Sequence, residues 1–368
     1  MATPPSGCTT MDDFPAEILQ HIFSFACLDG GRTGRTLSLV SRHIRAVSKS
    51  TKYQSIALEG IGSMERFLEH LAGMDSDPDP LFIRYLFLSR YDPPPINGPV
   101  TKPSVGRRIR KVFSPDSWLS SIASDLADPN WLRTHTDTHK FERIYDCTFR
   151  VIAGAAPTLQ VLAIVIPHPR QIPLQHISFP ALRDLTVFST EESRLQQSLA
   201  YHNPSPHPRP ILPSLRRIHL SGLDYLRQNM VEFIKATPSL THTCFTGLDV
   251  DGTLKPVILG LVDAKTGTAS ADSSNSPFPR PENFQKCFVR PRLSLHRFRE
   301  EEYSVIVDEM RQCARNHEGL VLTRTIFEDL DVDNSVDEAR GLWFDTIAGG
   351  IGCWNESDID LDVVARGD

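Results

Sequence analysis

Apolar residues recur along the middle of the chain in groups of three, spaced i, i+3 and i+5. Side chains alternate between the two faces of a strand, so the last two members of a group would share one face of a short strand. Three of the later groups begin after a proline and a small residue. We predict that six copies point into a common core: Tyr53/Ile56/Leu58, Ile83/Leu86/Leu88, Leu159/Leu162/Ile164, Leu182/Leu185/Val187, Leu215/Ile218/Leu220 and Leu240/Thr243/Phe245.

Stripes of apolar residues at helical spacing lie between the copies. The stripes are Met64/Phe67/Leu68/Leu71, Trp118/Leu119/Ile122/Leu126, Phe141/Ile144/Tyr145/Thr148/Ile152 and Leu223/Leu226/Met230/Phe233/Ile234. Short strands that alternate with helices predict an α/β fold with parallel strands and outer helices. One such unit cannot bury its own apolar face, so the copies are expected to stack. Their unequal separation predicts an irregular solenoid with insertions in its loops.

The N-terminal stretch 12–48 predicts two short helices joined by a glycine turn at Gly30-Gly31. Acidic residues and Pro15 suit the start of the first helix. Its apolar positions are Ile18, Leu19, Ile22, Phe23 and Ala26, and those of the second helix are Leu37, Val40, Ile44 and Val47. So short a segment buries too little surface to be stable alone, which indicates that an outside surface covers it.

The C-terminal part follows a Ser- and Pro-rich loop, 264–283. We expect a strand over 288–295, a helix over 303–314 and a strand over 320–322. The sequence Ser335-Val336-Asp337-Glu338 fits a capping box and predicts the start of a last helix. Ala339, Leu342, Trp343 and Ile347 would face inward on this helix, and Gly349-Gly350 would end it. Further loops are expected over 89–115 and 202–213.

Composition and charge exclude several classes of protein. The 368 residues carry a net charge of −6, which gives no electrostatic argument for binding nucleic acid. No apolar run has the length of a membrane span, and the N-terminus lacks a signal-peptide core. The seven cysteines are scattered without a C-x-x-C pair and suggest free thiols in a reducing compartment. We therefore expect a cytoplasmic or nuclear protein without membrane or nucleic-acid partners.

Motifs that could carry chemistry are incomplete. The segment from Gly30 to Arg35 has the wrong glycine spacing for a phosphate loop and lacks its lysine, so a turn is favoured. His135 and His139, with Glu142 nearby, show no third metal ligand. Asp329, Asp331 and Asp333 are followed by Asn334 and Arg340 where a calcium loop needs Gly and Glu.

A basic run, Arg107, Arg108, Arg110 and Lys111, resembles a nuclear-import signal, although a solvated loop is favoured. No nucleophile elbow, zinc-protease helix or dinucleotide-binding glycine pattern occurs. We expect no catalytic residues, no metal and no cofactor.

The N-terminal stretch resembles an F-box. The matching residues are Phe14-Pro15, Glu17-Ile18-Leu19, Ile22-Phe23 and Leu37-Ser38-Leu39-Val40-Ser41-Arg42 before Arg45. Ser41 stands where Cys is common and Ile44 where Trp is often found, and neither change removes the apolar face. The resemblance implies docking onto a Skp-family adaptor, and through it onto a cullin ubiquitin ligase. The implied adaptor-binding residues are Phe14, Pro15, Ile18, Leu19, Ile22, Phe23, Leu39 and Val40.

The spacing of the copies resembles that of leucine-rich repeats, and the ending from Trp343 to Trp354 resembles F-box/leucine-rich-repeat-like proteins of mushroom-forming fungi. The expected organisation is a flexible N-terminus (1–10), an F-box-like helical domain (11–50), a repeat domain (51–263), a mobile loop (264–283) and a C-terminal continuation of the repeats (284–368).

The resemblance implies a non-catalytic substrate receptor of an SCF-type ligase, whose repeats bind a target protein. The alternative is a scaffold without a ligase role, whose N-terminal helices only cap the repeats. The strand face opposite the core is the candidate target surface: Tyr85, Phe87 and Ser89; Val161, Ala163 and Val165; Asp184, Thr186 and Phe188; Arg217, His219 and Ser221; His242, Cys244 and Thr246. We expect a helix or loop to cover its apolar end. Its polar end, with Arg217, His219 and His242, is the predicted contact site.

Overall fold

A computed structural model describes the protein over residues 11, 14–73, 82–91, 138–166, 174, 177–189, 212–221, 233–234, 237–246, 255–262, 280–291, 300–324 and 332–355. Within these residues, no helix is long and apolar enough to span a membrane. These ranges exclude His135, Asp329, Asp331, the basic run from Arg107 to Lys111 and the stripe that begins at Trp118. His139 and Asp333 lie inside them, as do Phe233 and Ile234 of the stripe that begins at Leu223.

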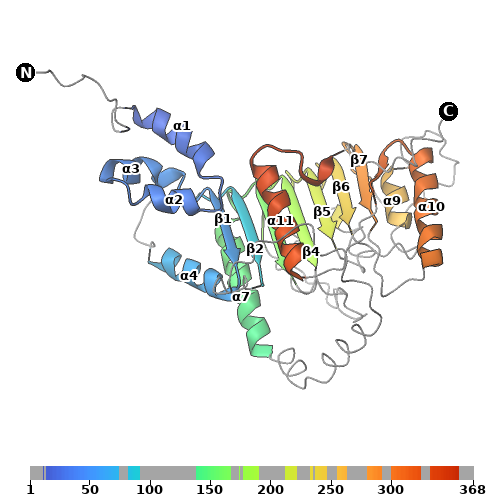
Figure 1. The fold of residues 1–368 in the computed structure, drawn as a ribbon, viewed down its shortest axis with the longest axis horizontal. Coiled ribbons are helices and arrows are strands. Elements are labelled where there is room, and N and C mark those ends of the chain that lie inside the picture. Colours follow the sequence, from blue (N-terminus) through green and yellow to red (C-terminus); the bar gives the residue numbers. More distant parts are fainter. Residues whose placement is uncertain are drawn as a thin grey trace, which may run out of the picture.

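The fold is α/β and is built on one sheet of eight parallel strands, paired in chain order (Figure 1). The strands are β1 (Ser55–Glu59), β2 (Tyr85–Ser89), β3 (Val161–Ile166), β4 (Asp184–Ser189), β5 (Arg217–Ser221), β6 (His242–Thr246), β7 (Lys286–Arg290) and β8 (Leu320–Leu322). The six predicted copies form β1 to β6. This arrangement is compatible with a repeat solenoid.

A constant register aligns the copies. Ile56 pairs with Leu86, which pairs with Leu162, and the ladder continues through Leu185, Ile218, Thr243, Cys287 and Leu320. These side chains face the main hydrophobic core, apart from Thr243, which is buried but polar. Because side chains alternate along a strand, the residues between them form equally regular rows on the other face of the sheet.

Helices cover the core face. They are α4 (Ile61–Ala72), α7 (Thr138–Ala155), α9 (Lys255–Val262) and α10 (Glu300–Asn316). Met64 of α4, Ile152 of α7, Leu261 of α9 and Met310 of α10 all pack into the same core. The predicted outer helices over Met64–Leu71, Phe141–Ile152 and 303–314 are therefore confirmed.

The proline-led entries of the repeats have a direct role between neighbouring copies. The Ser214 hydroxyl donates a hydrogen bond to the Pro180 carbonyl at 2.6 Å, and Ser239 donates to Pro213 at the same distance. Each serine thus ties the turn before its strand to the preceding turn. A small polar residue after proline is what this contact requires.

The N-terminal stretch forms three helices where two were predicted: α1 (Ala16–Ala26), α2 (Arg32–Leu37) and α3 (Arg42–Val47). The turn between α1 and α2 uses Gly30 and Gly31, whose φ angles of 74° and 96° favour glycine. The predicted second helix is interrupted because Ser41 adopts an extended conformation and its hydroxyl accepts a hydrogen bond from the Ile44 N–H, which starts α3 afresh.

A last helix, α11 (Val332–Ile347), lies on the other face of the sheet and is followed by the short helix η8 (Gly352–Trp354) (Figure 1). The predicted start of this helix, at the capping box, is wrong. The helix begins at Val332, so Ser335 lies inside it, where its hydroxyl is buried. Its end is as predicted: Gly349 has a φ of 86° directly after the last turn.

The strand expected over 288–295 begins earlier, at Lys286, and ends at Arg290. Phe284, Cys287 and Val289 have the i, i+3, i+5 spacing and all face the core, so β7 is a further copy of the repeat. Cys287 takes the place of an aliphatic residue, which hid the pattern. The strand over 320–322 is confirmed as β8.

Candidate functional site

Large exposed apolar side chains are concentrated at the N-terminus. Nine occur among the described residues, and seven of them precede residue 41. Ile18, Ile22 and Phe25 follow each other at i, i+4 and i+7 on one side of α1. We call the seven residues the N-terminal apolar surface: Met11, Phe14, Ile18, Ile22, Phe25, Leu39 and Val40.

Two of the predicted adaptor-binding residues are internal. Leu19 and Phe23 are 0% and 1% exposed and pack with Cys27, Ile44 and Val47 in a small core of their own. The prediction that they lie on the docking surface is therefore wrong. The apolar face of α1 is wider than one stripe, and Leu19 and Phe23 hold the three helices together. Phe14, Pro15, Ile18, Ile22, Leu39 and Val40 remain exposed.

The three N-terminal helices are joined to the first strand. The Gln54 side chain donates a 2.7 Å hydrogen bond to the Ser24 carbonyl, and the Ala57 N–H donates to the Gly30 carbonyl at 3.3 Å. Gly34 of α2 is packed so closely that a Cβ there would lie 2.3 Å from the Lys52 carbonyl oxygen. The helices therefore cap the β1 end of the sheet (Figure 1) while the N-terminal apolar surface stays open.

The sheet face under α11 is a second site of interest. Phe87, Val165 and Phe188 on the strands pack against Trp343 and Ile347 of α11. Arg340 of α11 pairs with Glu59 at 3.2 Å. The expectation that a helix covers the apolar end of this face is confirmed.

The cover extends further than predicted. Cys353 of η8 packs with Cys244, Phe288 and Val321 of β6 to β8. The Trp354 ring lies 5.9 Å from the ring of His242, centre to centre. None of the fifteen residues of the candidate target surface is exposed: ten are buried and five are half-buried.

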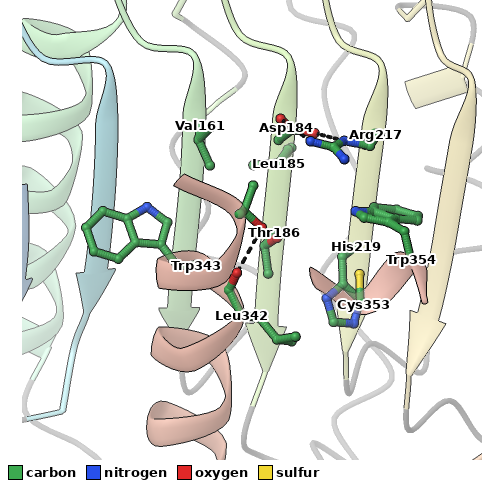
Figure 2. A pocket seen from close by; sticks show the side chains of 11 residues that line it. Val161, Asp184, Leu185, Thr186, Arg217, His219, Leu342, Trp343, Cys353 and Trp354 are labelled. Atoms are coloured by element: carbon green, nitrogen blue, oxygen red, sulfur yellow. Dashed lines mark hydrogen bonds and ion pairs between the residues drawn. The ribbon is translucent and has the colours of Figure 1, made fainter. Parts of the chain in front are cut away.

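The predicted contact residues have different environments, and Figure 2 shows two of them, Arg217 and His219. Arg217 forms an ion pair with Asp184, with Nη2 2.9 Å from Oδ2, and this hydrogen-bonded partner raises the pKa of Arg217. His242 is half-buried and stacks on Phe288. His219 is 1% exposed, so the prediction that it contacts a target at the surface is wrong in this arrangement. The reason is that η8 covers His219, and the spacing of residues in the sequence gives no sign of this cover.

His219 is buried beside two thiols. One ring nitrogen of His219, the Cys244 Sγ and the Cys353 Sγ lie within 4.8 Å of one another. The Nε2 atom of His219 is 3.0 Å from the Thr246 hydroxyl oxygen, while its Nδ1 has no hydrogen-bond partner. His219 and Cys244 are paired by the β5–β6 register, and η8 brings Cys353 over them.

The pKa values of the two thiols are shifted in opposite directions. A hydrogen bond from Cys353 lowers the pKa of Cys244 well below its ordinary value, against the effect of burial and with help from the charge of His219. Burial, followed by the hydrogen bond and the charge of Cys244, raises the pKa of Cys353. Of the two thiols, Cys244 is therefore the one that this arrangement makes easier to deprotonate.

The space beside these groups is small. A cavity of about 10 Å³ is lined by Asp184, Arg217, His219, Trp343 and Cys353, among others (Figure 2). That volume fits one water-sized group and excludes an organic substrate. The signal for His219 and Cys244 was present in the sequence, since both are the fifth residue of their copies. Nothing local marks Cys353 as their neighbour.

No protein-family model matches this chain, and a search of curated proteins finds no similar one.

Proposed function

We propose that this chain is the substrate-receptor subunit of an SCF-type cullin ubiquitin ligase, with its N-terminal helices bound to a Skp-family adaptor. The observation that carries the proposal is the N-terminal apolar surface, which includes five residues of the F-box-like pattern: Phe14, Ile18, Ile22, Leu39 and Val40. An apolar surface that remains open after its helices have built a core of their own is suited to a partner protein.

The scaffold alternative also has an observation in its favour. The N-terminal helices cap β1 through Gln54 and Gly30, which is what a capping element alone would do. Capping accounts for the contacts to β1, but it leaves the seven exposed apolar residues without a role. We therefore favour adaptor binding, with capping as the way in which the helices are fixed to the repeats.

The receptor hypothesis also needs a target site. Arg217 and His242 are half-buried at the same end of neighbouring strands, in direct register. We propose that a target protein contacts this end of β5 and β6, where the guanidinium of Arg217 and the imidazole of His242 are partly accessible. A receptor of this kind contributes proximity between target and ligase and performs no bond chemistry.

Affinity purification of the full tagged chain from cells, with identification of its partners, tests the proposal. Recovery of the adaptor together with a cullin is expected, whereas recovery of neither favours the scaffold. A variant with Arg217→Glu and His242→Ala, checked for folding by circular dichroism, tests the target site separately. It should retain the adaptor and lose at least one other partner. An unchanged set of partners would exclude this end of β5 and β6 as the target site.

A further inference from the structure

Two strands and the C-terminal segment bring three metal-binding side chains to one point. His219 comes from β5, Cys244 from β6 and Cys353 from η8, and all three are buried. The strand register fixes His219 opposite Cys244. The two cysteines are 109 positions apart along the sequence (353 − 244), so only the closed position of η8 completes the set.

The distances are close to those of a coordination shell. Bond lengths of about 2.3 Å to sulfur and 2.0–2.1 Å to nitrogen place the ligand atoms of a tetrahedral zinc ion roughly 3.5–3.8 Å apart. The three ligand atoms here lie within 4.8 Å of one another. Closing them around an ion needs movements of about 1 Å or less, which side-chain rotations supply.

The histidine is prepared for a ligand. Its Nε2 lies 3.0 Å from the Thr246 hydroxyl oxygen, and its Nδ1 has no hydrogen-bond partner although the residue is 1% exposed. A buried polar atom without a partner needs an explanation, and a metal ion is one. The outer hydrogen bond to Thr246 would then fix the ring, as is usual for metal-bound histidine.

The ligand types select the ion. Two sulfurs and an imidazole favour zinc or another thiophilic cation over calcium or magnesium, which need oxygen ligands. Two thiolates would also neutralise the charge of Zn²⁺, so that the occupied site could remain buried without net charge. The adjacent cavity of about 10 Å³ has room for a water molecule as the fourth ligand.

We propose that His219, Cys244 and Cys353 form a Zn²⁺ site that fastens the C-terminal segment to the sheet. The ion would link β5 and β6 to η8 and thereby hold α11 over the face that it covers. This role is independent of adaptor binding. It revises the expectation of no metal, which rested on ligands that are close in sequence.

The test uses the full chain, first stripped of metal under reducing conditions and then titrated with Zn²⁺ or with Co²⁺ as a spectroscopic probe. We expect one equivalent of zinc and, with cobalt, a sulfur-to-metal charge-transfer absorption. The midpoint of thermal unfolding should rise by roughly 3–4 °C at a zinc concentration about 100 times Kd. Cys244→Ser and Cys353→Ser should abolish the charge-transfer band and the rise in midpoint.

Cys287→Ser is the matched control, because Cys287 is equally buried on β7 but faces the opposite side of the sheet. It should retain the cobalt spectrum. A wild-type chain without charge-transfer absorption would overturn the proposal even if the variants failed to fold. A zinc equivalent that survives in both folded serine variants would also overturn it.

Discussion

Neighbouring residues of α1 have opposite environments. Leu19 is fully buried, whereas Ile18 is 48% exposed. Both are apolar and both belong to the F-box-like pattern, so the sequence alone could not separate the residue that builds the helical core from the one that is open to a partner. The separation follows from the packing of α1 on α3, which directs Leu19 and Phe23 toward Ile44.

This separation predicts different costs for two alanine substitutions. Leu19→Ala should lower the free energy of unfolding by about 2–5 kcal/mol, because it leaves a cavity in the core of the N-terminal helices. Ile18→Ala should change it by about 0.5 kcal/mol or less, because about half of this residue is already exposed to water. Urea unfolding of both variants checks the prediction, which equal losses would contradict.

Two glycines in helices offer a second pair of alanine substitutions to compare. Gly34→Ala should destabilise the protein by about 1–3 kcal/mol, because its Cβ would collide with the Lys52 backbone. Gly341→Ala, on α11, meets nothing within 4 Å and should stabilise by about 0.5–1 kcal/mol, since alanine favours helix. Thermal unfolding of the two variants, measured side by side, checks both predictions. A Gly34→Ala variant as stable as the wild type would mean that α2 does not pack against residues 51–53.

At the scale of elements, α11 explains why the second face of the sheet can be apolar. Phe87, Val161 and Phe188 would be exposed without it, and Trp343 lies at the centre of its contacts, with its ring 5.7 Å from that of Phe87. Ion pairs of Arg340 with Glu59 on β1 and of Glu338 with Arg290 on β7 fix the helix to the sheet.

Trp343→Ala should therefore lower the free energy of unfolding by about 3–5 kcal/mol and increase the binding of a hydrophobic dye. Ile351→Ala is the control, because Ile351 lies near the end of the same segment but is 60% exposed, and its effect should be about 0.5 kcal/mol or less. A Trp343→Ala variant as stable as the control would show that α11 does not hold this face closed.

The elements with a strict period were predictable, and those decided by single contacts were not. The strands β1 to β6 follow from their apolar triplets, and α4 and α7 from their stripes. The break between α2 and α3 depends on a single hydroxyl, that of Ser41. The predicted start of β7 was too far along the chain because Cys287 replaces an aliphatic residue. The cover by η8 carries no periodic signal, which is why His219 was expected at the surface.

At the scale of the whole molecule, one sheet connects two regions of different character. The N-terminal helices lie beyond β1 with an open apolar surface, and the C-terminal segment closes over the strands (Figure 1). The candidate sites follow this division: a partner surface at one end, and a buried cluster of His219, Cys244 and Cys353 under the cover. The partner surface could be predicted from a local sequence pattern, while the buried cluster could be found only from the arrangement of the elements in the structure.

The central claim is that the N-terminal apolar surface binds a Skp-family adaptor, and calorimetric titration of the purified full chain with the adaptor tests it most directly. The wild type should bind. Ile18→Ala with Ile22→Ala should weaken binding about 1,000-fold, at about 2 kcal/mol for each anchor, without loss of folding. Val305→Ala, 58% exposed on α10 at the far end of the sheet, should bind like the wild type. No binding by the wild type, or equal binding by the double variant, would contradict the claim.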